Sequence, residues 1–371
     1  MRPQTTDQHH QWMQRALELA RKAAGKTAPN PMVGAVLVKN GKVVGEGFHK
    51  KAGTPHAEIH ALKQAGAKAR GATLYVTLEP CCHFGRTGPC TEALLAAGVS
   101  HVFIGSRDPN PLVAGKGIKK LRTAGLKVEL GVEGKACDAL ICAYRQRTLR
   151  GKPWVQGKLA CSLDGRIATK TFASKWISNA AARKFAHQLR ERADAIVIGS
   201  NTVRCDNPKL TVRLGKKEIF KPVVVVDSKL SLALSFQLFR RKPDQAGVIL
   251  ATTNASLLSH RHAWEKLGFT LWVLPQGADG FVDLPALLHK MGELGWNEIL
   301  VEGGSTLMTA FLRARLVDSL AVAIAPIFIG SDGQALVREL GVEKITDALH
   351  LSDVSIQALG DNVLVQGRVR K

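Results

Sequence analysis

Three short motifs decide how the first half of the 371-residue chain is interpreted: His56-Ala57-Glu58, Glu79-Pro80-Cys81 and, nine residues later, Cys90. A strand-like apolar run ends just before the Pro-Cys pair, and helix-like runs follow His56 and Cys90. One imidazole and two thiolates form the three-ligand set of a catalytic zinc site, which leaves the fourth position of the metal for water. The motifs therefore predict an α/β domain with a zinc site at His56, Cys81 and Cys90.

Glu58 is the predicted catalytic residue of this zinc site. Zinc lowers the pKa of a bound water towards neutrality and so produces a hydroxide nucleophile. Glu58 lies two residues after His56, where its carboxylate can sit beside the water without binding the metal. There it can take the water's proton and deliver it to a ring nitrogen and then to a leaving amine. This chemistry is hydrolytic deamination; the alternative is a structural zinc site or a set of unconnected buried cysteines.

Two adjacent cysteines follow the strand-like run, and either could bind the metal. Cys82 could replace Cys81, but the Pro-Cys pattern favours Cys81 as the ligand. Cys81 and Cys90 are both expected at or just before helix starts, where the helix dipole favours a thiolate. We therefore expect Cys82 to be a bystander.

The loop between the two cysteine ligands is longer than the two-residue spacer of nucleic-acid-editing and nucleoside deaminases. Such a loop could reach over a substrate and present His83 and Arg86 to polar or phosphate groups; the alternative is an inert surface loop. Asn30 is a further candidate, because its amide offers both a donor and an acceptor to a pyrimidine edge. Asn30-Pro31 could equally be only a turn.

The chain is long enough to fold as two domains rather than around one core. We place the boundary at Gly151-Lys152-Pro153, with a deaminase domain over 1–150 and a second domain over 151–371. The first domain alternates helical and strand patterns and contains the hairpin signal Asn40-Gly41, which predicts a three-layer α/β/α arrangement around one mixed sheet. Its expected elements are helix 12–23, strands 33–39 and 42–48, helix 56–65, strand 73–78, helix 91–97, strand 101–105, helix 117–124, strand 127–131 and one helix-like segment, 133–150.

The second half also has an α/β pattern, because short apolar runs alternate with helical ones. Gly303-Gly304-Ser305-Thr306 opens a helix after a strand-like run, so it offers amides and hydroxyls to a phosphate group; the alternative is a glycine turn. The absence of a G-x-G-x-x-G motif argues against a Rossmann domain. The expected elements are strands 154–160, 195–199, 222–227, 248–252, 270–274, 298–301 and 319–329, and helices 179–192, 284–294 and 306–315.

The composition indicates a folded and strongly basic protein. Apolar residues make up 45% and charged residues 22% of the chain, which excludes a mainly disordered protein, and the formal net charge is +22. This charge raises nucleic acid, anionic membranes and phosphorylated small molecules as partners. It is spread over both halves, however, and only 5% of the residues are aromatic, too few for a base-stacking surface. We therefore expect a phosphorylated small molecule, and neither nucleic acid nor a membrane, as partner.

Targeting and redox signals favour the cytoplasm. The N-terminal segment lacks the apolar core of a signal peptide, and no apolar run approaches the ~20 residues that span a bilayer. Seven cysteines, an odd and unevenly placed set, argue against a disulfide framework. We expect a cytoplasmic homo-oligomer.

The motifs of the first half resemble those of a known family. Pro29-Asn30-Pro31-x-Val33-Gly34, His56-Ala57-Glu58 and the stretch 77–90 are similar to the deaminase domain of the RibD family, the bifunctional enzymes of riboflavin biosynthesis. The resemblance implies the cytidine-deaminase fold, with the zinc ligands and the proton shuttle named above. Cys82 departs from the family pattern, in which a serine or similar small residue is commoner.

The resemblance continues to the C-terminus and covers about residues 9–370. The second half is similar to the RibD reductase domain, which resembles dihydrofolate reductase in fold and uses NADPH. The motifs that carry the similarity are 158–166, Ser174-x-Trp176-Ile177-Ser178, 206–213, 301–304 and Ala325-Pro326-x-x-x-Gly330. The family's substrate pocket would then consist of Ser174, Arg190, Leu210, Arg213 and Glu302. Its NADPH site would consist of Ala160, Trp176, Thr202, Asp206, Ser228, Gly304, Ser305 and Thr306.

Without the resemblance, three of these residues have simpler interpretations. Arg190 and Arg213 could be surface cations, and Trp176 could be a core aromatic residue. The segment 141–144, Ile-Cys-Ala-Tyr, departs from the family, which usually carries an asparagine several residues before an aromatic residue. We therefore expect different contacts in the segment that joins the domains.

The resemblance implies two consecutive reactions. The first domain would deaminate 2,5-diamino-6-ribosylamino-4(3H)-pyrimidinone 5′-phosphate with release of ammonia, and the second would reduce the ribosyl group to ribityl with NADPH. Asp164 and Glu302 are the candidates for an acid in the second step. The rival hypotheses are a nucleic-acid base deaminase, which the charge suggests, and a zinc-stabilised scaffold without activity.

Overall fold

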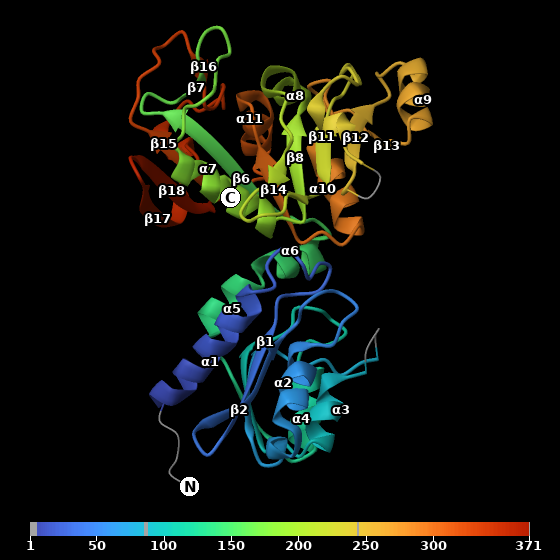
Figure 1. Cartoon of the computed structure of the whole chain (residues 1–371), viewed down its shortest axis with the longest axis vertical. Coiled ribbons are helices and arrows are strands. Elements are labelled where there is room, and N and C mark those ends of the chain that lie inside the picture. Colours follow the sequence, from blue (N-terminus) through green and yellow to red (C-terminus); the bar gives the residue numbers. More distant parts are fainter. Residues whose placement is uncertain (1–5, 85–87, 243–244, 371) are drawn as a thin grey trace. The chain divides into compact units, whose positions relative to one another are not determined.

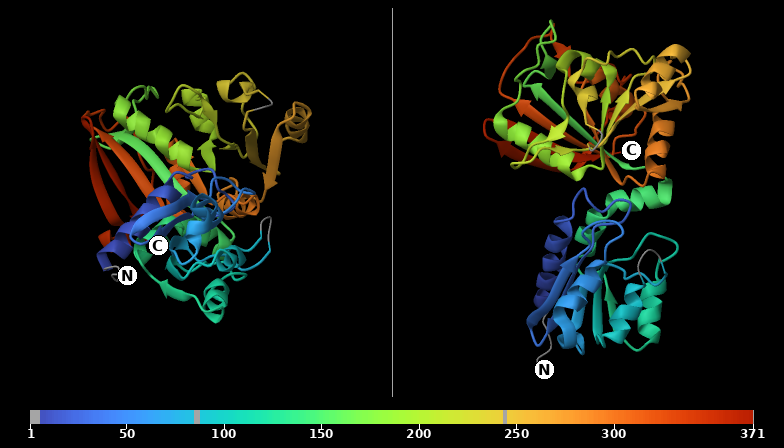
Figure 2. Two further views of the ribbon diagram at one scale, coloured as in Figure 1. Left: turned by 60° about the horizontal axis from the view of Figure 1, so that its bottom comes forward. Right: turned by 45° about the vertical axis from the view of Figure 1, so that its right-hand side comes forward.

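The computed structural model describes residues 6–84, 88–242 and 245–370. Its packing divides the chain into two compact units, Met1–Lys152 and Pro153–Lys371, each with its own sheet and helices (Figure 1; Figure 2). The boundary expected after residue 150 lies two residues from this division. None of the helices in these ranges combines the length and the apolar character needed to cross a membrane.

A five-stranded mixed sheet forms the centre of the first unit, as the sequence predicts. In the order β2-β1-β3-β4-β5, β1 is antiparallel to β2 and β3, whereas β3, β4 and β5 run parallel. Asn40 and Gly41 connect β1 to β2 with φ angles of 51° and 71°, the left-handed geometry typical of an Asn-Gly hairpin. The strands are β1 (Gly34–Lys39), β2 (Lys42–Phe48), β3 (Thr73–Leu78), β4 (His101–Ser106) and β5 (Lys127–Leu130).

Helices cover both faces of this sheet, which gives the expected three layers (Figure 1). Alternate residues of a strand point to opposite faces, so Leu37 packs in the core beneath α2, α3 and α4, while Val36 packs in the core beneath α1 and α5. The helices are α1 (Thr6–Arg21), α2 (Ala57–Ala65), the 3₁₀ helix η1 (Gly66–Ala69), α3 (Cys90–Ala96), α4 (Lys116–Thr123), α5 (Gly134–Leu140) and α6 (Cys142–Arg150).

The helix-like segment expected over 133–150 is helical, and it is divided into two helices, α5 and α6. The break falls at Ile141, whose φ of −102° and ψ of 10° lie outside the α-helical region. Ile141 is buried with Leu78 and Tyr144 in a small apolar cluster. Leu78 is distant in sequence, which explains why the local pattern did not reveal the break.

Gly34, the first residue of β1, lies against the backbone of α1. A Cβ atom there would be 1.9 Å from the carbonyl oxygen of Ala16, so no side chain fits unless the helix moves. We expect Gly34→Ala to lower the free energy of unfolding by about 3 kcal/mol, because it overpacks a buried contact. Denaturant titration measures the change. In the control Gly88→Ala the new Cβ meets no atom within 4 Å and should have almost no effect; equal stabilities of the two variants would contradict this packing.

The second unit is built on a nine-stranded sheet with the order β13-β12-β11-β8-β14-β6-β15-β18-β17. The strands from β13 to β15 in this order are parallel, and β18 and β17 continue the sheet as an antiparallel hairpin. The strands are β6 (Trp154–Ser162), β8 (Ala195–Gly199), β11 (Val223–Val226), β12 (Val248–Thr253), β13 (Thr270–Leu274), β14 (Glu298–Glu302), β15 (Ser319–Ala325), β17 (Leu351–Leu359) and β18 (Asn362–Val369). Two short pairs lie outside this sheet: β7 (Arg166–Ala168) with β16 (Gln334–Ala335), and β9 (Thr211–Val212) with β10 (Ile219–Phe220).

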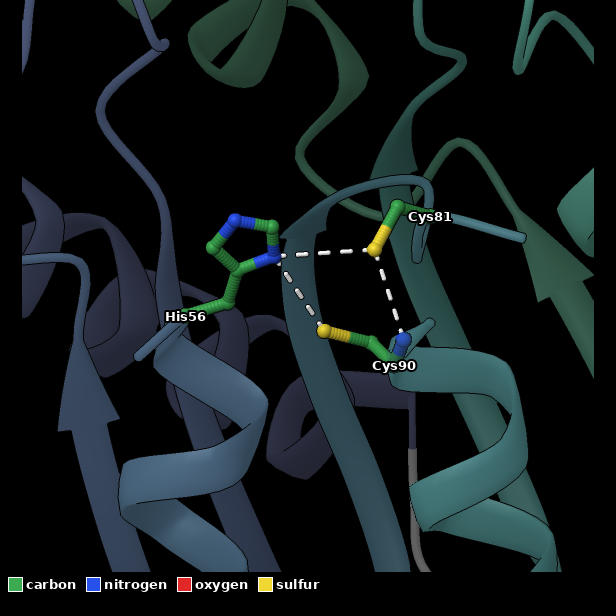
Figure 3. A group of neighbouring side chains, drawn as sticks. All are labelled: His56, Cys81 and Cys90. Carbon is green, nitrogen blue, oxygen red and sulfur yellow. Dashed lines mark hydrogen bonds between the residues drawn. The ribbon is translucent and has the colours of Figure 1, made fainter. Parts of the chain in front are cut away.

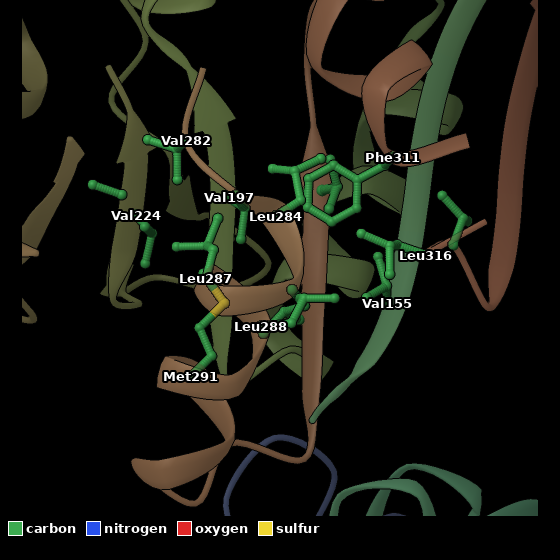
Figure 4. Close-up of a cluster of buried hydrophobic side chains, with 14 of the residues drawn as sticks. Val155, Val197, Val224, Val282, Leu284, Leu287, Leu288, Met291, Phe311 and Leu316 are labelled. Atoms are coloured by element: carbon green, nitrogen blue, oxygen red, sulfur yellow. The ribbon is translucent and has the colours of Figure 1, made fainter. Parts of the chain in front are cut away.

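Helices also cover both faces of the large sheet. Leu287 and Met291 of α10 and Phe311 of α11 are buried against one face (Figure 4), whereas Val203 of α8 and Trp264 of α9 are buried against the other. The helices are α7 (Ala180–Arg192), α8 (Ser200–Asp206), the 3₁₀ helix η2 (Gln237–Arg240), α9 (Leu258–Lys266), α10 (Leu284–Glu293), α11 (Ser305–Arg313) and the 3₁₀ helix η3 (Ile345–Asp347).

The connections of the large sheet diverge between the neighbouring strands β8 and β14. After β8 the chain continues through α8 to β11 on one side, and after β14 it continues through α11 to β15 on the other side. α8 and α11 also lie on opposite faces, since they belong to different cores. Such a switch point opens a crevice at the carboxyl ends of the strands, where open α/β sheets bind ligands.

The strand expected over 319–329 is shorter than the sequence pattern suggests. β15 stops at Ala325, because the next residue, Pro326, has no backbone N–H with which to continue the ladder. In the loop that follows, the backbone N–H of Ile329 donates to the carboxylate of Asp164 at 3.2 Å. This loop is therefore held by a side chain rather than by strand pairing.

Candidate functional sites

His56, Cys81 and Cys90 come together from three different elements (Figure 3). His56 immediately precedes α2, Cys81 follows β3 by three residues, and Cys90 is the first residue of α3. Their ligand atoms, one imidazole nitrogen and two sulfurs, all lie within 4.8 Å of one another. Nδ1 of His56 is 3.6 Å from Sγ of Cys81 and 3.3 Å from Sγ of Cys90.

These separations fit a zinc ion. Zn–N bonds of about 2.0–2.1 Å and Zn–S bonds of about 2.3 Å in a tetrahedral site put the nitrogen about 3.6 Å from each sulfur. Three protein ligands leave one coordination position for water, which is the arrangement of catalytic zinc. Cys82 belongs to no such donor group in the part of the chain that the structure describes, so the geometry favours Cys81 as the ligand.

The surroundings of Cys81 favour its thiolate form. Hydrogen bonding with the Cys90 thiol, assisted by His56, lowers the pKa of Cys81, and the backbone N–H of Cys90 donates to the Cys81 sulfur at 3.3 Å. The hydrogen bond between the Cys81 sulfur and the His56 imidazole raises the pKa of His56. The expectation that Cys81 itself lies at a helix start is wrong, because Cys81 is in the loop between β3 and α3. The amide that contacts its sulfur is nevertheless the first amide of α3.

The carboxylate of Glu58 is buried beside the three ligands. Glu58 is the second residue of α2 and is only 3% exposed. Burial raises the pKa of Glu58, although the neighbouring His56 opposes the rise. Its Oε2 has no hydrogen-bond partner among the described residues, whereas a buried carboxylate oxygen normally has one. An unpartnered carboxylate oxygen at this place is suited to exchanging protons with a water and a substrate.

Glu79 fixes the loop that carries Cys81, a role that no sequence motif indicated. Its buried carboxylate accepts hydrogen bonds from the backbone N–H groups of Gly115 at 2.9 Å, Ile118 at 3.1 Å and Asp108 at 3.3 Å. Two of these amides lie at the start of α4, where the helix dipole favours a negative charge. Because only one residue separates Glu79 from Cys81, these bonds hold a zinc ligand in place.

We expect Glu79→Ala to weaken zinc binding by about 10–100-fold, the usual effect of losing a group that orients a metal ligand. It also leaves three backbone amides without their acceptor, which lowers the stability of the first unit. Competition with a chromophoric chelator measures the affinity for zinc. Glu92→Ala, which removes an exposed carboxylate from α3, is the matched control and should bind zinc like the wild type. Wild-type affinity in Glu79→Ala would show that the carboxylate does not position Cys81.

Asn30 and His83, two expected substrate contacts, have different surroundings. Nδ2 of Asn30 is 3.0 Å from Nε2 of the buried His49, whose ring meets the ring of His56 edge-on with 5.2 Å between centroids. Asn30 is thus connected to a zinc ligand through His49, which no motif indicated. Nδ1 of His83 is buried and has no hydrogen-bond partner within the described ranges. Arg86, the third expected contact, lies outside the described residues.

In the second unit, Arg190 and Glu302 form a bidentate ion pair. Nε and Nη2 of Arg190, on α7, donate to the two carboxylate oxygens of Glu302 at 2.6 and 2.7 Å, and Nη1 donates to the backbone oxygen of Thr211 at 3.2 Å. The two side chains are only 16% and 8% exposed, so Arg190 is not a surface cation. Burial opposes the charge of Glu302, but the Arg190 guanidinium outweighs it and lowers the pKa of Glu302.

Lys158 lies beside this ion pair. It is level with Glu302 in the parallel pairing of β6 with β14, and the charges of Glu302 and Arg190 both act on it. Burial lowers the pKa of Lys158, although Glu302 opposes the change. A lysine that gives up its proton more readily beside an anchored carboxylate is a candidate proton donor. No sequence motif predicted a role for Lys158.

Arg213 borders a cavity of about 360 Å³ that is rich in cationic side chains. It is about half exposed, and its Nη1 donates to Oγ1 of Thr211 at 3.2 Å. Leu210, another expected pocket residue, is buried next to Thr211 and has a φ of 51°. The residues that line the cavity are Ala180, Arg183, Lys184, His187, Arg213 and Leu214. Their charge suits an anionic group of a ligand.

Ser174 and Asp206, one expected in the substrate pocket and the other at the cofactor, are hydrogen-bonded. Oγ of Ser174 donates to Oδ1 of Asp206 at 2.9 Å, which connects the segment before α7 to α8. Trp176 is 70% exposed, so the alternative interpretation as a core aromatic is wrong. The guanidinium of Arg183 lies over its ring at 4.5 Å, a cation–π contact. The indole is therefore available to a ligand.

The residues at the switch point contact one another across the crevice. Oγ1 of Thr202, on α8, accepts a hydrogen bond from the amide of Gly304 at 3.0 Å. Gly303 has a φ of 100°, and a Cβ there would be 2.5 Å from the Thr202 hydroxyl, so glycine is required. Ser305 and Thr306 form the first turn of α11. A helix N-terminus entered by two glycines is suited to a phosphate group.

Ala160 and Ser228, the remaining expected cofactor contacts, lie on either side of the switch point. Ala160 is on β6, opposite Ala323 of β15. Ser228 follows β11 and is buried, and its Oγ accepts a hydrogen bond from the backbone N–H of Val282 at 3.0 Å. The hydroxyl proton of Ser228 can still be donated to a ligand.

Asp164, one of the two candidate acids, holds the loop after β15 through hydrogen bonds. The Ser162 hydroxyl and the backbone N–H of Gly330 donate to its carboxylate and lower its pKa to about 2. Asp164 therefore stays ionised at neutral pH and holds the loop after β15. It is not retained as a proton donor.

Comparison with protein families defines the class of the protein. The cytidine and deoxycytidylate deaminase zinc-binding region matches residues 6–106, and the RibD C-terminal domain matches residues 153–365. The first unit has the fold of the cytidine and deoxycytidylate deaminases, and the second has the α/β fold of the RibD C-terminal domain. The chain is thus a zinc-dependent deaminase joined to an NADPH-dependent reductase.

Full-length relatives give the family. Riboflavin biosynthesis protein RibD of Aquifex aeolicus is 41% identical over 354 residues, which cover 95% of this chain and 96% of that protein; the Escherichia coli RibD is 40% identical over 368 residues, with 96% and 98% covered. The structure of Acinetobacter baumannii RibD, form 1, matches with a TM-score of 0.88 and 34% identity, covering 99% of this chain and 100% of that one. The chain belongs to the RibD family.

Proposed function

We propose that the first unit deaminates 2,5-diamino-6-ribosylamino-4(3H)-pyrimidinone 5′-phosphate and that the second reduces the ribosyl group of the product to ribityl, consecutive steps of riboflavin biosynthesis. The observation that carries the proposal is the group of His56, Cys81 and Cys90 with the unpartnered, buried carboxylate of Glu58 beside it. The similarity over nearly the full chain to riboflavin biosynthesis proteins supports this substrate class.

In the first unit, Glu58 moves protons while His56, Cys81 and Cys90 hold the metal. Zinc, when bound, lowers the pKa of a coordinated water and so supplies the nucleophile. Glu58 would take a proton from this water and deliver it to a ring nitrogen of the pyrimidine. It then moves a proton to the exocyclic amine, which leaves as ammonia while the carbonyl forms. Asn30 and the loop residues His83 and Arg86 would bind the substrate.

In the second unit, residues on both sides of the crevice would bind NADPH. Thr202, Gly304, Ser305 and Thr306 would hold its phosphates, and Ala160, Trp176, Asp206 and Ser228 would line the rest of the cofactor site. NADPH, when bound, supplies a hydride to the substrate.

The substrate of the reductase would lie next to this cofactor site. Arg213 and its cationic cavity would bind the substrate phosphate, and Ser174 and Leu210 would line the pocket. The Arg190–Glu302 pair would shape it, and Lys158 would supply the proton that completes the reduction.

A coupled assay tests both reactions on one substrate. The purified protein with zinc, the pyrimidine phosphate and NADPH should release ammonia first and oxidise NADPH afterwards. If neither step occurs with zinc present, the proposed function is wrong. If only one step occurs, the assignment of the other unit is wrong.

We also propose a cytoplasmic homo-oligomer in which the domains divide near residue 150 and the partner is a phosphorylated small molecule, not nucleic acid or a membrane. The cysteines in the described part of the chain form no disulfide, which suits a reducing compartment. Size-exclusion chromatography with light scattering tests the oligomeric state.

A further inference from the structure

A small polar cluster at the carboxyl ends of β8 and β11 has no part in the reactions described so far. Arg204, on α8, donates from Nη1 to Oγ of Ser200 at 3.4 Å and from Nη2 to Oγ of Ser231. Ser231 belongs to the loop after β11, the parallel neighbour of β8. Arg204 and Ser231 are exposed, and Ser200 is half-buried. The Arg204 guanidinium thus bridges the segments that follow two adjacent strands.

The cluster lies on one side of the switch point. Arg204 is one half-turn after Thr202, whose hydroxyl accepts the amide of Gly304 across the crevice. On the opposite side of the crevice is β14, whose Glu302 forms the buried pair with Arg190, followed in the sheet by β6 and β15. Because the substrate pocket is proposed at the Arg190–Glu302 pair, a dinucleotide with its pyrophosphate at Gly304 would direct its nicotinamide towards β14 and β6. Its adenosine would then extend over β11, towards Arg204.

The charges around Arg204 favour an anion. No carboxylate in the described part of the chain forms an ion pair with Arg204, which donates to the hydroxyls of Ser200 and Ser231. Asp227, at the end of β11, is buried, and its oxygens accept hydrogen bonds from the backbone N–H groups of Ser231 and Leu232 and from the Ser231 hydroxyl. Lys229, on the same loop, is exposed and adds a second positive charge.

This arrangement differs from a site that selects NAD(H). Such sites present a carboxylate to the 2′-hydroxyl of the adenosine ribose, whereas sites for NADP(H) place an arginine near the 2′-phosphate. Here the carboxylate of Asp227 is turned into its own loop, and the arginine faces solvent. Arginine binds phosphate oxygens with charge-assisted, often bidentate hydrogen bonds.

We propose that Arg204, together with the hydroxyl of Ser200, binds the 2′-phosphate of NADPH and makes the reductase selective for NADPH over NADH. The proposal rests on the placement of the cofactor at the switch point given under the proposed function.

Calorimetric titration with NADP⁺ and NAD⁺, which differ only in the 2′-phosphate, tests the proposal without the pyrimidine substrate. We expect Arg204→Ala to bind NADP⁺ about 10–100-fold more weakly and to bind NAD⁺ like the wild type. Arg204→Lys should retain part of the affinity for NADP⁺. Arg240→Ala removes an exposed arginine that donates to the backbone oxygen of Ser235 and is the matched control; it should change neither affinity.

The ratio of kcat/KM for NADPH to that for NADH gives a second readout and should fall by the same factor in Arg204→Ala. Unchanged NADP⁺ binding in this variant, or an equal loss for NADP⁺ and NAD⁺, would overturn the proposal. Neither result affects the proposed function, which fails only if the wild-type protein does not turn over the pyrimidine phosphate and NADPH.

Discussion

Glu58→Gln is expected to lower the rate of deamination by at least about 100-fold while the protein keeps its zinc. An amide has nearly the shape of a carboxylate but cannot carry a proton between the water, the ring nitrogen and the leaving amine. Stability should not fall, because the substitution removes a buried acidic group whose Oε2 has no partner among the described residues. Ammonia release gives the rate, and elemental analysis gives the zinc content per chain.

The matched control for Glu58→Gln is Glu18→Gln, which changes an exposed acid on α1 that is 60% exposed. It should deaminate at the wild-type rate. Reductase activity, assayed with the deaminated product, should be the same in the wild type and in both variants. Wild-type deamination by Glu58→Gln would remove Glu58 from the mechanism, and loss of zinc would make it a structural residue of the metal site.

Local sequence patterns predicted the central helices and strands of both units. They failed where contacts between residues distant in sequence determine the structure. The strand 73–78 and the hairpin at Asn40-Gly41 follow from apolar periodicity and turn chemistry, which are local properties. The C-terminal hairpin of β17 and β18 was not predicted. Its edge strand, β17, is exposed and lacks a buried, alternating pattern. α8 was missed for a similar reason: in its seven residues only Val203 is buried.

The candidate zinc site was predictable because its chemistry demands particular residue types at short spacings. The side chains that support this site are not indicated by any short motif. Glu79 accepts amides 29 to 39 residues away, and His49 meets His56 only in the folded chain. In the second unit, strand pairing brings Lys158 level with Glu302, although 144 positions separate them. Such contacts depend on topology, so no motif could show them.

Glu302→Gln is expected to abolish reduction, with a loss of at least about 100-fold, and to lower the free energy of unfolding of the second unit by about 3–5 kcal/mol. The substitution leaves the Arg190 guanidinium buried without its counter-charge, and it removes the anion beside Lys158. Denaturant unfolding measures the stability, and NADPH oxidation with the deaminated product measures the reduction. Ammonia release by the first unit of the same protein should remain at the wild-type level.

The chain offers a matched control on the same two elements, since Arg192 of α7, which is 56% exposed, forms an ion pair with Glu298 of β14. Arg192→Ala should cost less than about 1 kcal/mol and leave reduction unchanged, because exposed pairs contribute little. The double variant Arg190→Met with Glu302→Leu separates structure from catalysis: apolar replacement of both charges should restore much of the stability. Reduction should stay lost in this variant. If activity returned with stability, the pair would act only as a support for the fold, and the substrate pocket assigned to Glu302 would be wrong.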